Sequence, residues 1–209
     1  MQKTVCFTTL GCKVNQYDSQ AMLEQFEQHG YTVAPAGVPA DVYVVNTCTV
    51  TGTGDKKSLQ AIRRCRRRNP AAELVVTGCL AQRMGEALRE TGARLILGTQ
   101  YRAQVVELLE QAVREGVQMV AVEGVSNAPY EPLTIHSHEG HTRAVMKIQE
   151  GCDNHCTYCI IPSVRGGVRS RPLEEIRREA RFLPQNQTGS SAHTSVLFVP
   201  PALCVHGMP

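Results

Sequence analysis

The chain has 209 residues, a formal net charge of +3 and nine cysteines, and 42% of its residues are hydrophobic. That length is enough for one full domain and part of a second. No apolar run is long enough to span a bilayer, so the composition excludes a membrane-spanning helix and favours a soluble, cytoplasmic protein. An odd number of cysteines without a secretory leader is typical of a reducing compartment, where clustered thiols usually indicate a bound metal.

Short β-rich runs alternate with helical patterns in the first part of the chain. Strands are expected over residues 3–10, 42–46, 74–77, 95–97 and 117–122. Between them, apolar residues spaced one helical turn apart predict helices over 15–29 and 104–114, and the first of these stops at Gly30. This alternation predicts an α/β fold in which helices cover an open parallel sheet, forming an N-terminal domain over residues 1–125.

Three of the expected strands end in the same way, with a cysteine just past the carboxyl end. These cysteines are Cys12, Cys48 and Cys79. In an open α/β sheet the carboxyl ends of the strands line the crevice where ligands bind, so the three thiols are expected to converge. They are candidates for a three-thiolate metal site, and the alternative is that they are three small buried hydrophobic residues. Cys6 in mid-strand, Cys65 in mid-helix and Cys204 in the tail are not candidates.

Cationic side chains crowd the segment between Asp55 and Asn69. They are Lys56, Lys57, Arg63, Arg64, Arg66, Arg67 and Arg68. Such a run along one side of a helix suits RNA phosphates, and a merely solvated helix face explains it equally well. Without interleaved aromatic residues, the run is not expected to distinguish one base from another.

Residues 126–143 are rich in Pro, Gly, Ser and His, which is typical of a linker. His136, His138 and His141 could ligate a metal there, but a solvated linker is the favoured interpretation.

The segment 151–159 is the most informative part of the chain, because Cys152, Cys156 and Cys159 place three thiolates in eight residues with CxxxCxxC spacing. Three ligands on a short loop would hold a [4Fe-4S] cluster with one iron open to a small molecule. A closed zinc site would take a fourth protein ligand, and here His155 lies between the cysteines instead of extending the array. Disulfides fit an odd cysteine count in a reducing compartment poorly.

Four segments together resemble the methylthiotransferases of the radical S-adenosylmethionine superfamily. They are LGCKVNQYDS, NTCTVTGTGDKKS, TGCLAQ and KIQEGCDNHCTYCIIPSVRG. The resemblance runs to about Leu183, and GCKVNQ is most similar to the branch that acts on N6-threonylcarbamoyladenosine in tRNA. The branches that act on isopentenyladenosine in tRNA or on a ribosomal protein are the alternatives.

The resemblance implies two [4Fe-4S] clusters with different tasks. The cluster at Cys152, Cys156 and Cys159 would bind S-adenosylmethionine and, on one-electron reduction, generate a 5′-deoxyadenosyl radical. Tyr158 matches the position that packs near the adenine, although a core-facing tyrosine is possible. An auxiliary cluster at the ligands Cys12, Cys48 and Cys79 would carry the sulfur. The implied product is a methylthio group at C2 of the modified adenosine next to the anticodon, and the implied partners are tRNA and an electron donor such as a flavodoxin-type reductant, with no membrane.

The resemblance also implies a second fold unit over residues 144–183, the start of a radical S-adenosylmethionine partial α/β barrel. Its first strand is expected over 144–149 and its first helix over 172–182, where Pro172, Glu174 and Glu175 mark the start of the helix. Arg165, Arg169 and Arg171 follow the cysteine loop and could meet carboxylates of the substrate or cofactor.

The tail differs in composition from the rest of the chain, because residues 184–209 contain no Asp, Glu, Lys or Arg. Few residues follow Cys159, whereas full α/β barrels run to about 250 residues. We therefore expect a truncated or frame-shifted product whose tail is not a native continuation, with a short strand possible over 194–199. A non-catalytic iron-sulfur or tRNA-binding fragment is the alternative to an active enzyme.

Overall fold

The computed structural model describes residues 2–126, 128–136, 145–182 and 197–198. Six strands form a sheet in the order β2-β1-β3-β4-β5-β6, and every neighbouring pair is parallel. The strands are β1 (Thr4–Thr9), β2 (Thr32–Val33), β3 (Val42–Thr47), β4 (Glu73–Gly78), β5 (Leu95–Leu97) and β6 (Met119–Ala121). The parallel sheet is confirmed. Strand β2 was not predicted, because two residues are too short to show a periodic pattern.

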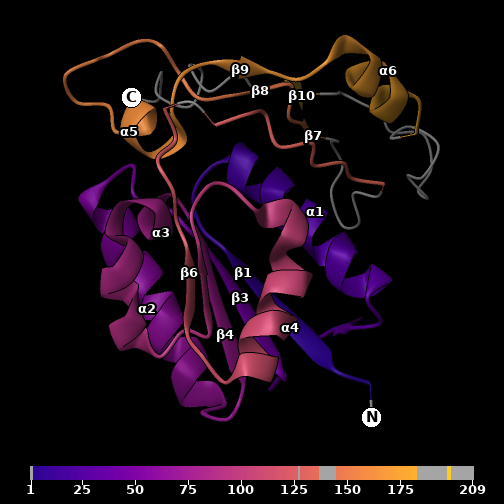
Figure 1. Ribbon diagram of the computed structural model, residues 1–209, viewed down its shortest axis with the longest axis vertical. Coiled ribbons are helices and arrows are strands. Elements are labelled where there is room, and N and C mark those ends of the chain that lie inside the picture. Colours follow the sequence, from indigo (N-terminus) through magenta and orange to yellow (C-terminus); the bar gives the residue numbers. More distant parts are fainter. Residues whose placement is uncertain (1, 127, 137–144, 183–196, 199–209) are drawn as a thin grey trace.

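Helices cover both faces of this sheet, with α1 and α4 on one side and α2 and α3 on the other (Figure 1). The helical elements are α1 (Lys13–Gln28), α2 (Gly52–Arg68), α3 (Cys79–Met84), the 3-10 turns η1 (Gly85–Thr91) and η2 (Arg102–Gln104), and α4 (Val105–Glu115). The helices predicted over 15–29 and 104–114 are confirmed as α1 and α4. A helix was also expected between Asp55 and Asn69, and it is α2, whose N-cap Thr51 accepts a hydrogen bond from the Gly54 N–H at 3.0 Å.

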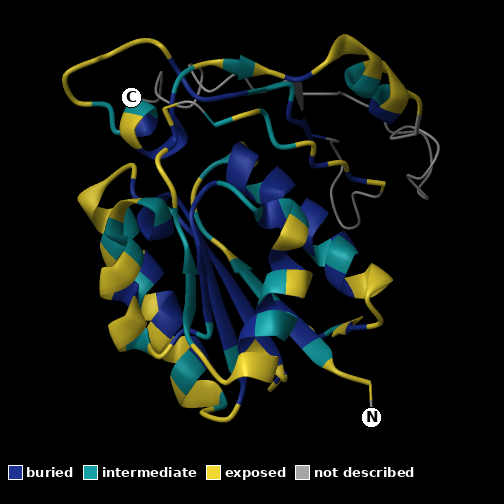
Figure 2. Cartoon of the chain, in the orientation of Figure 1, coloured by how far each residue is buried: buried dark blue, intermediate teal, exposed yellow. Residues whose placement is uncertain are grey.

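The core has two halves because successive side chains of a strand point to opposite faces. Tyr43 and Val45 pack with Ile62 of α2 on one face, whereas Val42 and Val44 belong to the cluster on the other face. All six residues of β3 are buried, which is typical of a central parallel strand covered on both sides. Figure 2 shows these central strands as the most deeply buried part of the fold.

A second region lies across the carboxyl edge of the sheet (Figure 1). It contains β7 (Val145–Met146), β8 (Gln149–Glu150), α5 (Ile161–Arg165), β9 (Arg169–Ser170), α6 (Leu173–Phe182) and β10 (Leu197–Phe198). Strand β10 pairs in parallel with β7, and β8, α5, β9 and α6 lie between them in sequence. The single strand expected over 144–149 is split into β7 and β8, and the predicted first helix is confirmed as α6.

Part of the segment interpreted as a solvated linker is buried instead. Leu133 and Ile135 are 2% and 1% exposed and pack with Tyr17 and Ala21 of α1. The expectation fails here because these two apolar side chains alternate with polar ones and cover the helix surface. His136 is held by Glu24, whose carboxylate lies 2.9 Å from both the backbone nitrogen and Nδ1 of the histidine. His138 and His141 lie outside the described residues.

Among the residues that the structure describes, no helix is long and apolar enough to cross a membrane.

Candidate metal centre

The three cysteines predicted at strand ends lie at the carboxyl edge of the sheet. Cys12 precedes α1, Cys48 follows β3 and Cys79 is the first residue of α3. Gly11 has φ +100°, and a Cβ built on it would lie 2.9 Å from both Cβ and Sγ of Cys48. The side chain of Cys48 therefore packs directly against the backbone that leads into Cys12.

Cys79 is the most deeply enclosed of the three thiols. Burial raises its pKa, the Arg165 guanidinium opposes that rise, and the nearby thiols of Cys12 and Cys48 raise the pKa further. The geometry places Cys48 against the backbone before Cys12, and Cys79 beside Arg165, at the same edge of the sheet. That the three thiols bind one metal centre stays a prediction.

Polar side chains at the strand ends hold the three cysteine segments together. The Asn15 amide donates to the carbonyl oxygens of Leu10 at 2.7 Å and Thr47 at 3.0 Å. Thr47 Oγ1 donates to the Thr77 carbonyl at 2.6 Å and accepts from the Ala81 N–H at 3.3 Å. These bonds connect the ends of β1, β3 and β4, so the backbone that carries each cysteine is tied to its neighbour.

The CxxxCxxC loop is anchored at its first cysteine. The Cys152 N–H donates to the Gly166 carbonyl at 3.0 Å, and Cys152 itself is buried. Gly151 has φ +78°, and a Cβ on it would lie 1.8 Å from the Gly167 carbonyl oxygen, so only glycine fits there. The start of the loop is thus packed backbone to backbone against the segment that follows α5.

The rest of the loop faces outward. Cys156 is exposed and Cys159 is half-buried, with its N–H donating to the Cys156 carbonyl at 3.0 Å. Tyr158 is 72% exposed, so the alternative of a core-facing tyrosine is wrong. Its contact with an adenine ring stays a prediction. A small molecule can therefore approach the loop from the side of Cys156 and Tyr158.

Both cysteine sets suit an iron-sulfur cluster by their chemistry. Soft, anionic thiolates are the preferred ligands of such clusters. Within the described part of the chain, no three His, Cys, Asp or Glu side chains are grouped tightly enough to hold a single metal ion. A four-iron cluster with one open iron would take one thiolate on each of its other three irons, so its ligands lie further apart than those of a single ion. The three thiols of each set are the right kind and number of ligands for such a cluster.

A cluster of buried charges, which the sequence analysis missed, joins the two regions. Its members are Asp18, Arg102, Lys147, Glu150 and Arg165. Lys147 Nζ lies 2.6 Å from Asp18 Oδ1, and Arg165 Nη1 lies 2.6 Å from Glu150 Oε1. Arg102 pairs with Asp18 and, at 3.1 Å, with Glu150. Elements from both regions thus supply charges to one desolvated site.

The charges balance within this cluster. Glu131 pairs with Arg102 at 2.8 Å, so three carboxylates face three cations. Burial would raise the pKa of Glu150, but Arg102, Lys147 and Arg165 together hold it below its ordinary range. Burial likewise opposes the charged form of Arg102, and its carboxylate partners, Asp18 first, raise its pKa above the usual value. Glu150 and Arg102 are therefore held in their charged forms.

One hint of this cluster was present in the sequence. Asp18 lies in the LGCKVNQYDS segment, and Lys147 and Glu150 lie in or beside the expected first strand of the second region, among residues expected to be buried. A charge at a buried position needs a partner. A single sequence does not reveal which partner it has, because Arg102 belongs to neither motif.

The arginines after the cysteine loop have protein partners. Arg165 is part of the buried cluster, and Arg171 Nη1 lies 2.5 Å from Glu179 Oε2 of α6. Burial raises the pKa of Glu179, and the Arg171 guanidinium opposes that rise. Arg165 and Arg171 therefore pair with carboxylates of the protein and are not available to the carboxylates of a ligand.

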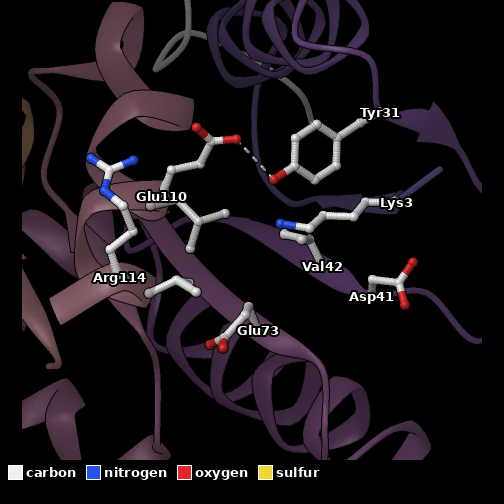
Figure 3. Close-up of a pocket in the computed structure, with 9 residues that line it drawn as sticks. Lys3, Tyr31, Asp41, Val42, Glu73, Glu110 and Arg114 are labelled. Carbon is white, nitrogen blue, oxygen red and sulfur yellow. Dashed lines mark hydrogen bonds between the residues drawn. The ribbon is translucent and has the colours of Figure 1, made fainter. Parts of the chain in front are cut away.

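A pocket lies at the opposite, amino-terminal edge of the sheet. It has a volume of about 480 Å³ and is lined by Lys3, Tyr31, Asp41, Val42, Glu73, Leu109, Glu110, Val113 and Arg114 (Figure 3). Its charges are mixed, and it contains no cysteine. Since ligands of open α/β sheets bind at the carboxyl edge, this pocket is not the candidate site.

An α/β fold with a CxxxCxxC loop agrees with the radical S-adenosylmethionine class, and two family profiles match the chain. The profile of "Uncharacterized protein family UPF0004" matches residues 4–98, and that of the "Radical SAM superfamily" matches residues 146–195. The second match extends beyond Leu183, where the motif resemblance ends.

Known methylthiotransferases are similar to this chain. It is 46% identical to threonylcarbamoyladenosine tRNA methylthiotransferase MtaB of Bacillus subtilis (strain 168), over 86% of this chain and 40% of the relative. It is 39% identical to ribosomal protein uS12 methylthiotransferase RimO of Myxococcus xanthus (strain DK1622), over 87% of this chain and 38% of the relative. The chain thus spans less than half the length of these relatives.

A solved structure shares the fold. The radical S-adenosylmethionine methyltransferase TsrM from Kitasatospora setae superposes with a TM-score of 0.54 at 14% identity, over 85% of this chain and 45% of that one. The chain belongs to the radical S-adenosylmethionine methylthiotransferase family.

The contact between Gly11 and Cys48 can be tested by substitution. We expect Gly11→Ala to destabilise the fold by the left-handed backbone penalty, about 1–2 kcal/mol, plus about 1–3 kcal/mol for the close approach of Cβ to Cys48. Gly30→Ala is the matched control, since Gly30 also has positive φ (+82°) but nothing lies within 4 Å of its added Cβ. Urea unfolding of both variants measures the difference. Equal losses of stability would contradict the packing described here.

The buried charge cluster gives a second expectation. Replacing Arg102 with Met keeps the volume but removes one of the three buried cations, so that Glu131 loses its ion-pair partner and three carboxylates face only Lys147 and Arg165. The free energy of unfolding should therefore fall by about 3–5 kcal/mol. The control is Arg177→Met, which breaks the exposed pair with Glu174 and should cost about 0.5 kcal/mol or less. A similar loss in both variants, measured by urea unfolding, would show that the cluster is not energetically coupled.

Proposed function

We propose that this chain carries the two cluster sites of a cytoplasmic tRNA methylthiotransferase that inserts a methylthio group at C2 of N6-threonylcarbamoyladenosine next to the anticodon. The observation that carries the proposal is the meeting of two regions at the carboxyl edge of the sheet. There the segment that follows the CxxxCxxC loop reaches the N-terminal cysteine set, with Arg165 Nε 3.4 Å from Cys79 Sγ.

Each cysteine set has a separate task in this proposal. Cys152, Cys156 and Cys159 would hold the [4Fe-4S] cluster that binds S-adenosylmethionine, and Cys12, Cys48 and Cys79 would hold the auxiliary cluster. When reduced, the first cluster would supply the electron that cleaves bound S-adenosylmethionine into methionine and a 5′-deoxyadenosyl radical, which can remove hydrogen from an inert C–H bond. The Tyr158 ring, which is exposed beside Cys159, would stack on the adenine of the cofactor.

Radical chemistry needs water to be excluded, and the described residues contribute to this. Cys79 and Cys152 are both buried, so each set has one thiolate on the protein side. The Thr99 hydroxyl donates to the Val164 carbonyl at 2.8 Å and thereby fastens α5 to the end of the sheet. This packing would keep the space between the two sets dry, which also tunes cluster potentials.

The exposed face of α2 is the part of the chain that best suits tRNA phosphates. Ser58, Ala61, Ile62 and Cys65 form its buried face. The other sides of the helix carry six exposed cations, which are Lys56, Lys57, Arg63, Arg64, Arg67 and Arg68. None of the six forms an ion pair with a residue that the structure describes. From Lys57 to Arg68 this face extends for about 16 Å at 1.5 Å per residue. Such a row favours a phosphate backbone over a solvated helix face.

The seventh cation of the run has a structural task. Arg66 is half-buried, and its Nη1 donates to the carbonyls of Pro70 at 3.0 Å and Ala72 at 3.1 Å. Beside it, a groove of about 440 Å³ runs between α2 and η1, with Arg63 and Arg67 among its lining residues. Arg66 shapes this groove, and its neighbours remain available to an anionic partner.

The choice of nucleoside rests on similarity. Identity to the Bacillus subtilis relative is 46%, against 39% to the ribosomal-protein methylthiotransferase of Myxococcus xanthus. The GCKVNQ segment agrees with the former. A flavodoxin-type reductant would deliver the electrons near Cys156, which is exposed.

A second candidate function is a non-catalytic iron-sulfur and tRNA-binding fragment. Among the described residues, the second region forms only two-stranded sheets, β7 with β10 and β8 with β9. A radical enzyme needs more strands to enclose its substrate. Cluster binding without cleavage of S-adenosylmethionine would distinguish this function from the first.

Iron counting tests the proposed function directly. After anaerobic reconstitution we expect about eight irons per chain, and about four after substitution of either cysteine set by Ala, as two four-iron clusters require. The control Cys6→Ala/Cys65→Ala should keep all of the iron, because both thiols lie in the core cluster between α2 and the sheet.

Iron content and cleavage of S-adenosylmethionine together distinguish the two candidate functions. Full iron content with formation of 5′-deoxyadenosine under dithionite supports the enzyme, whereas full iron content without it favours the fragment. Iron that does not change in either triple variant would refute both cluster assignments.

The basic face of α2 predicts a specific salt dependence of tRNA binding. The plot of log K for tRNA binding against log salt concentration has a negative slope. Replacing Arg64 and Arg68 with Gln should make this slope less negative by about 1.5, since each lost phosphate contact contributes about 0.7–0.9. The control Arg114→Gln/Arg177→Gln removes the same charge from exposed positions on α4 and α6. Fluorescence anisotropy with tRNA at several salt concentrations measures both slopes, and equal changes would mean that α2 is only a solvated face.

A further inference from the structure

Arg165 makes a contact with the N-terminal cysteine set that no family profile or relative's name assigns. Its Nε donates toward Cys79 Sγ at 3.4 Å, and both side chains are buried, at 3% exposure each. The sulfur of Cys79 therefore has a cationic N–H donor beside it in a site without bulk water. Arg165 itself comes from α5, just after the other cysteine set.

The remaining nitrogens of the guanidinium are fixed by the buried charge cluster. Nη1 donates to Glu150 Oε1 at 2.6 Å, and Nη2 donates to Asn15 Oδ1 at 2.6 Å. Asp18 Oδ2 lies 3.5 Å from Nη2. Because the planar group is held by carboxylate and amide oxygens on two sides, the direction of its Nε–H is set by the fold and not by the thiol.

These contacts connect the two cysteine sets through one side chain. Asn15 and Asp18 lie on the helix that starts after Cys12, while Glu150 lies two residues before Cys152. Arg165 thus meets residues adjacent to both sets as well as the Cys79 sulfur itself. A residue needed only to neutralise Glu150 would not have to reach Cys79.

We propose that Arg165 is a positioning residue that donates a hydrogen bond to the Cys79 sulfur of the N-terminal metal centre and thereby raises the reduction potential of that centre. The inference rests on the proposed function, because it requires Cys12, Cys48 and Cys79 to hold an iron-sulfur cluster. Hydrogen bonds to ligand sulfurs and nearby positive charge stabilise the more negative, reduced state of a cluster. The effect is strongest where water is excluded.

Lysine substitution separates this task from charge balance. Arg165→Lys keeps the buried positive charge, but a single ammonium group cannot reproduce the fork that reaches Glu150, Asn15 and Cys79 at once. Arg102→Lys is the matched control, since Arg102 is also buried and also pairs with Asp18 and Glu150. The two variants disturb the same ion cluster, and only the first removes the contact recorded between Arg165 and Cys79.

The experiment is a redox titration of the N-terminal centre in the full chain, with Cys152, Cys156 and Cys159 changed to Ala so that one centre is observed. At a fixed applied potential we expect Arg165→Lys to lower the ratio of reduced to oxidised centre about tenfold, which is about 59 mV for a one-electron couple. Arg102→Lys should leave the midpoint unchanged.

The outcomes separate the inference from the proposed function. An unchanged midpoint in Arg165→Lys, with iron retained, overturns the inference alone. A parent chain that binds no iron at Cys12, Cys48 and Cys79 overturns both. An equal shift in the two lysine variants would also overturn the inference, because it would assign the effect to the whole ion cluster.

If Arg165→Lys does not fold, the contact between Arg165 and Cys79 can be tested in the chain that keeps Arg165. The chain with one reduced centre is labelled with nitrogen-15 in its arginine guanidinium groups and studied by electron spin echo spectroscopy. We expect a nitrogen-15 coupling to the paramagnetic centre, absent from unlabelled protein. A labelled, reduced centre without such a coupling would overturn the inference.

Discussion

The pairing of buried charges between α1, η2 and the second region constrains how the two parts of this chain meet. An unpaired ion in such a site costs several kcal/mol, so the regions can dock only where each cation finds its carboxylate. Asp18 of α1 and Arg102 of η2 belong to the N-terminal domain, and Lys147, Glu150 and Arg165 belong to the second region. A shift of one residue in β8 would move Glu150 out of the site. The docking register is therefore specified by charge.

This constraint places the cysteine loop as well. Glu150 is followed directly by Gly151 and Cys152, and the close approach of Gly151 to the Gly167 carbonyl leaves the backbone little freedom. On the other side, Asn15 connects the ends of β1 and β3 and also accepts from Arg165. The ion cluster and the cysteine segments thus share residues, so the geometry of one determines that of the other.

The sheet and the cysteine positions could be predicted from sequence because both follow from local rules. Alternating apolar runs identify parallel strands, and the topology of an open sheet places Cys12, Cys48 and Cys79 at one edge. The ion cluster could not be predicted, since Arg102 is 84 residues from Asp18 and Arg165 is 147 residues from Asp18. The burial of Leu133 and Ile135 was missed for a similar reason, because a segment rich in Pro, Gly and Ser does not reveal the helix surface it covers.

An ion cluster is not the only way to hold two regions together, and this bears on what Arg165 does. Well-packed apolar side chains of similar volume often stabilise an interface as well as buried ion pairs do, so the charges need not be present for stability. An apolar interface would, however, place no N–H donor beside Cys79. Arg102 and Arg165 share Asp18 and Glu150 as partners, but Arg165 also donates to a sulfur. The cost of burying these charges is thus easiest to understand if the cluster orients a donor toward Cys79, the proposed metal ligand.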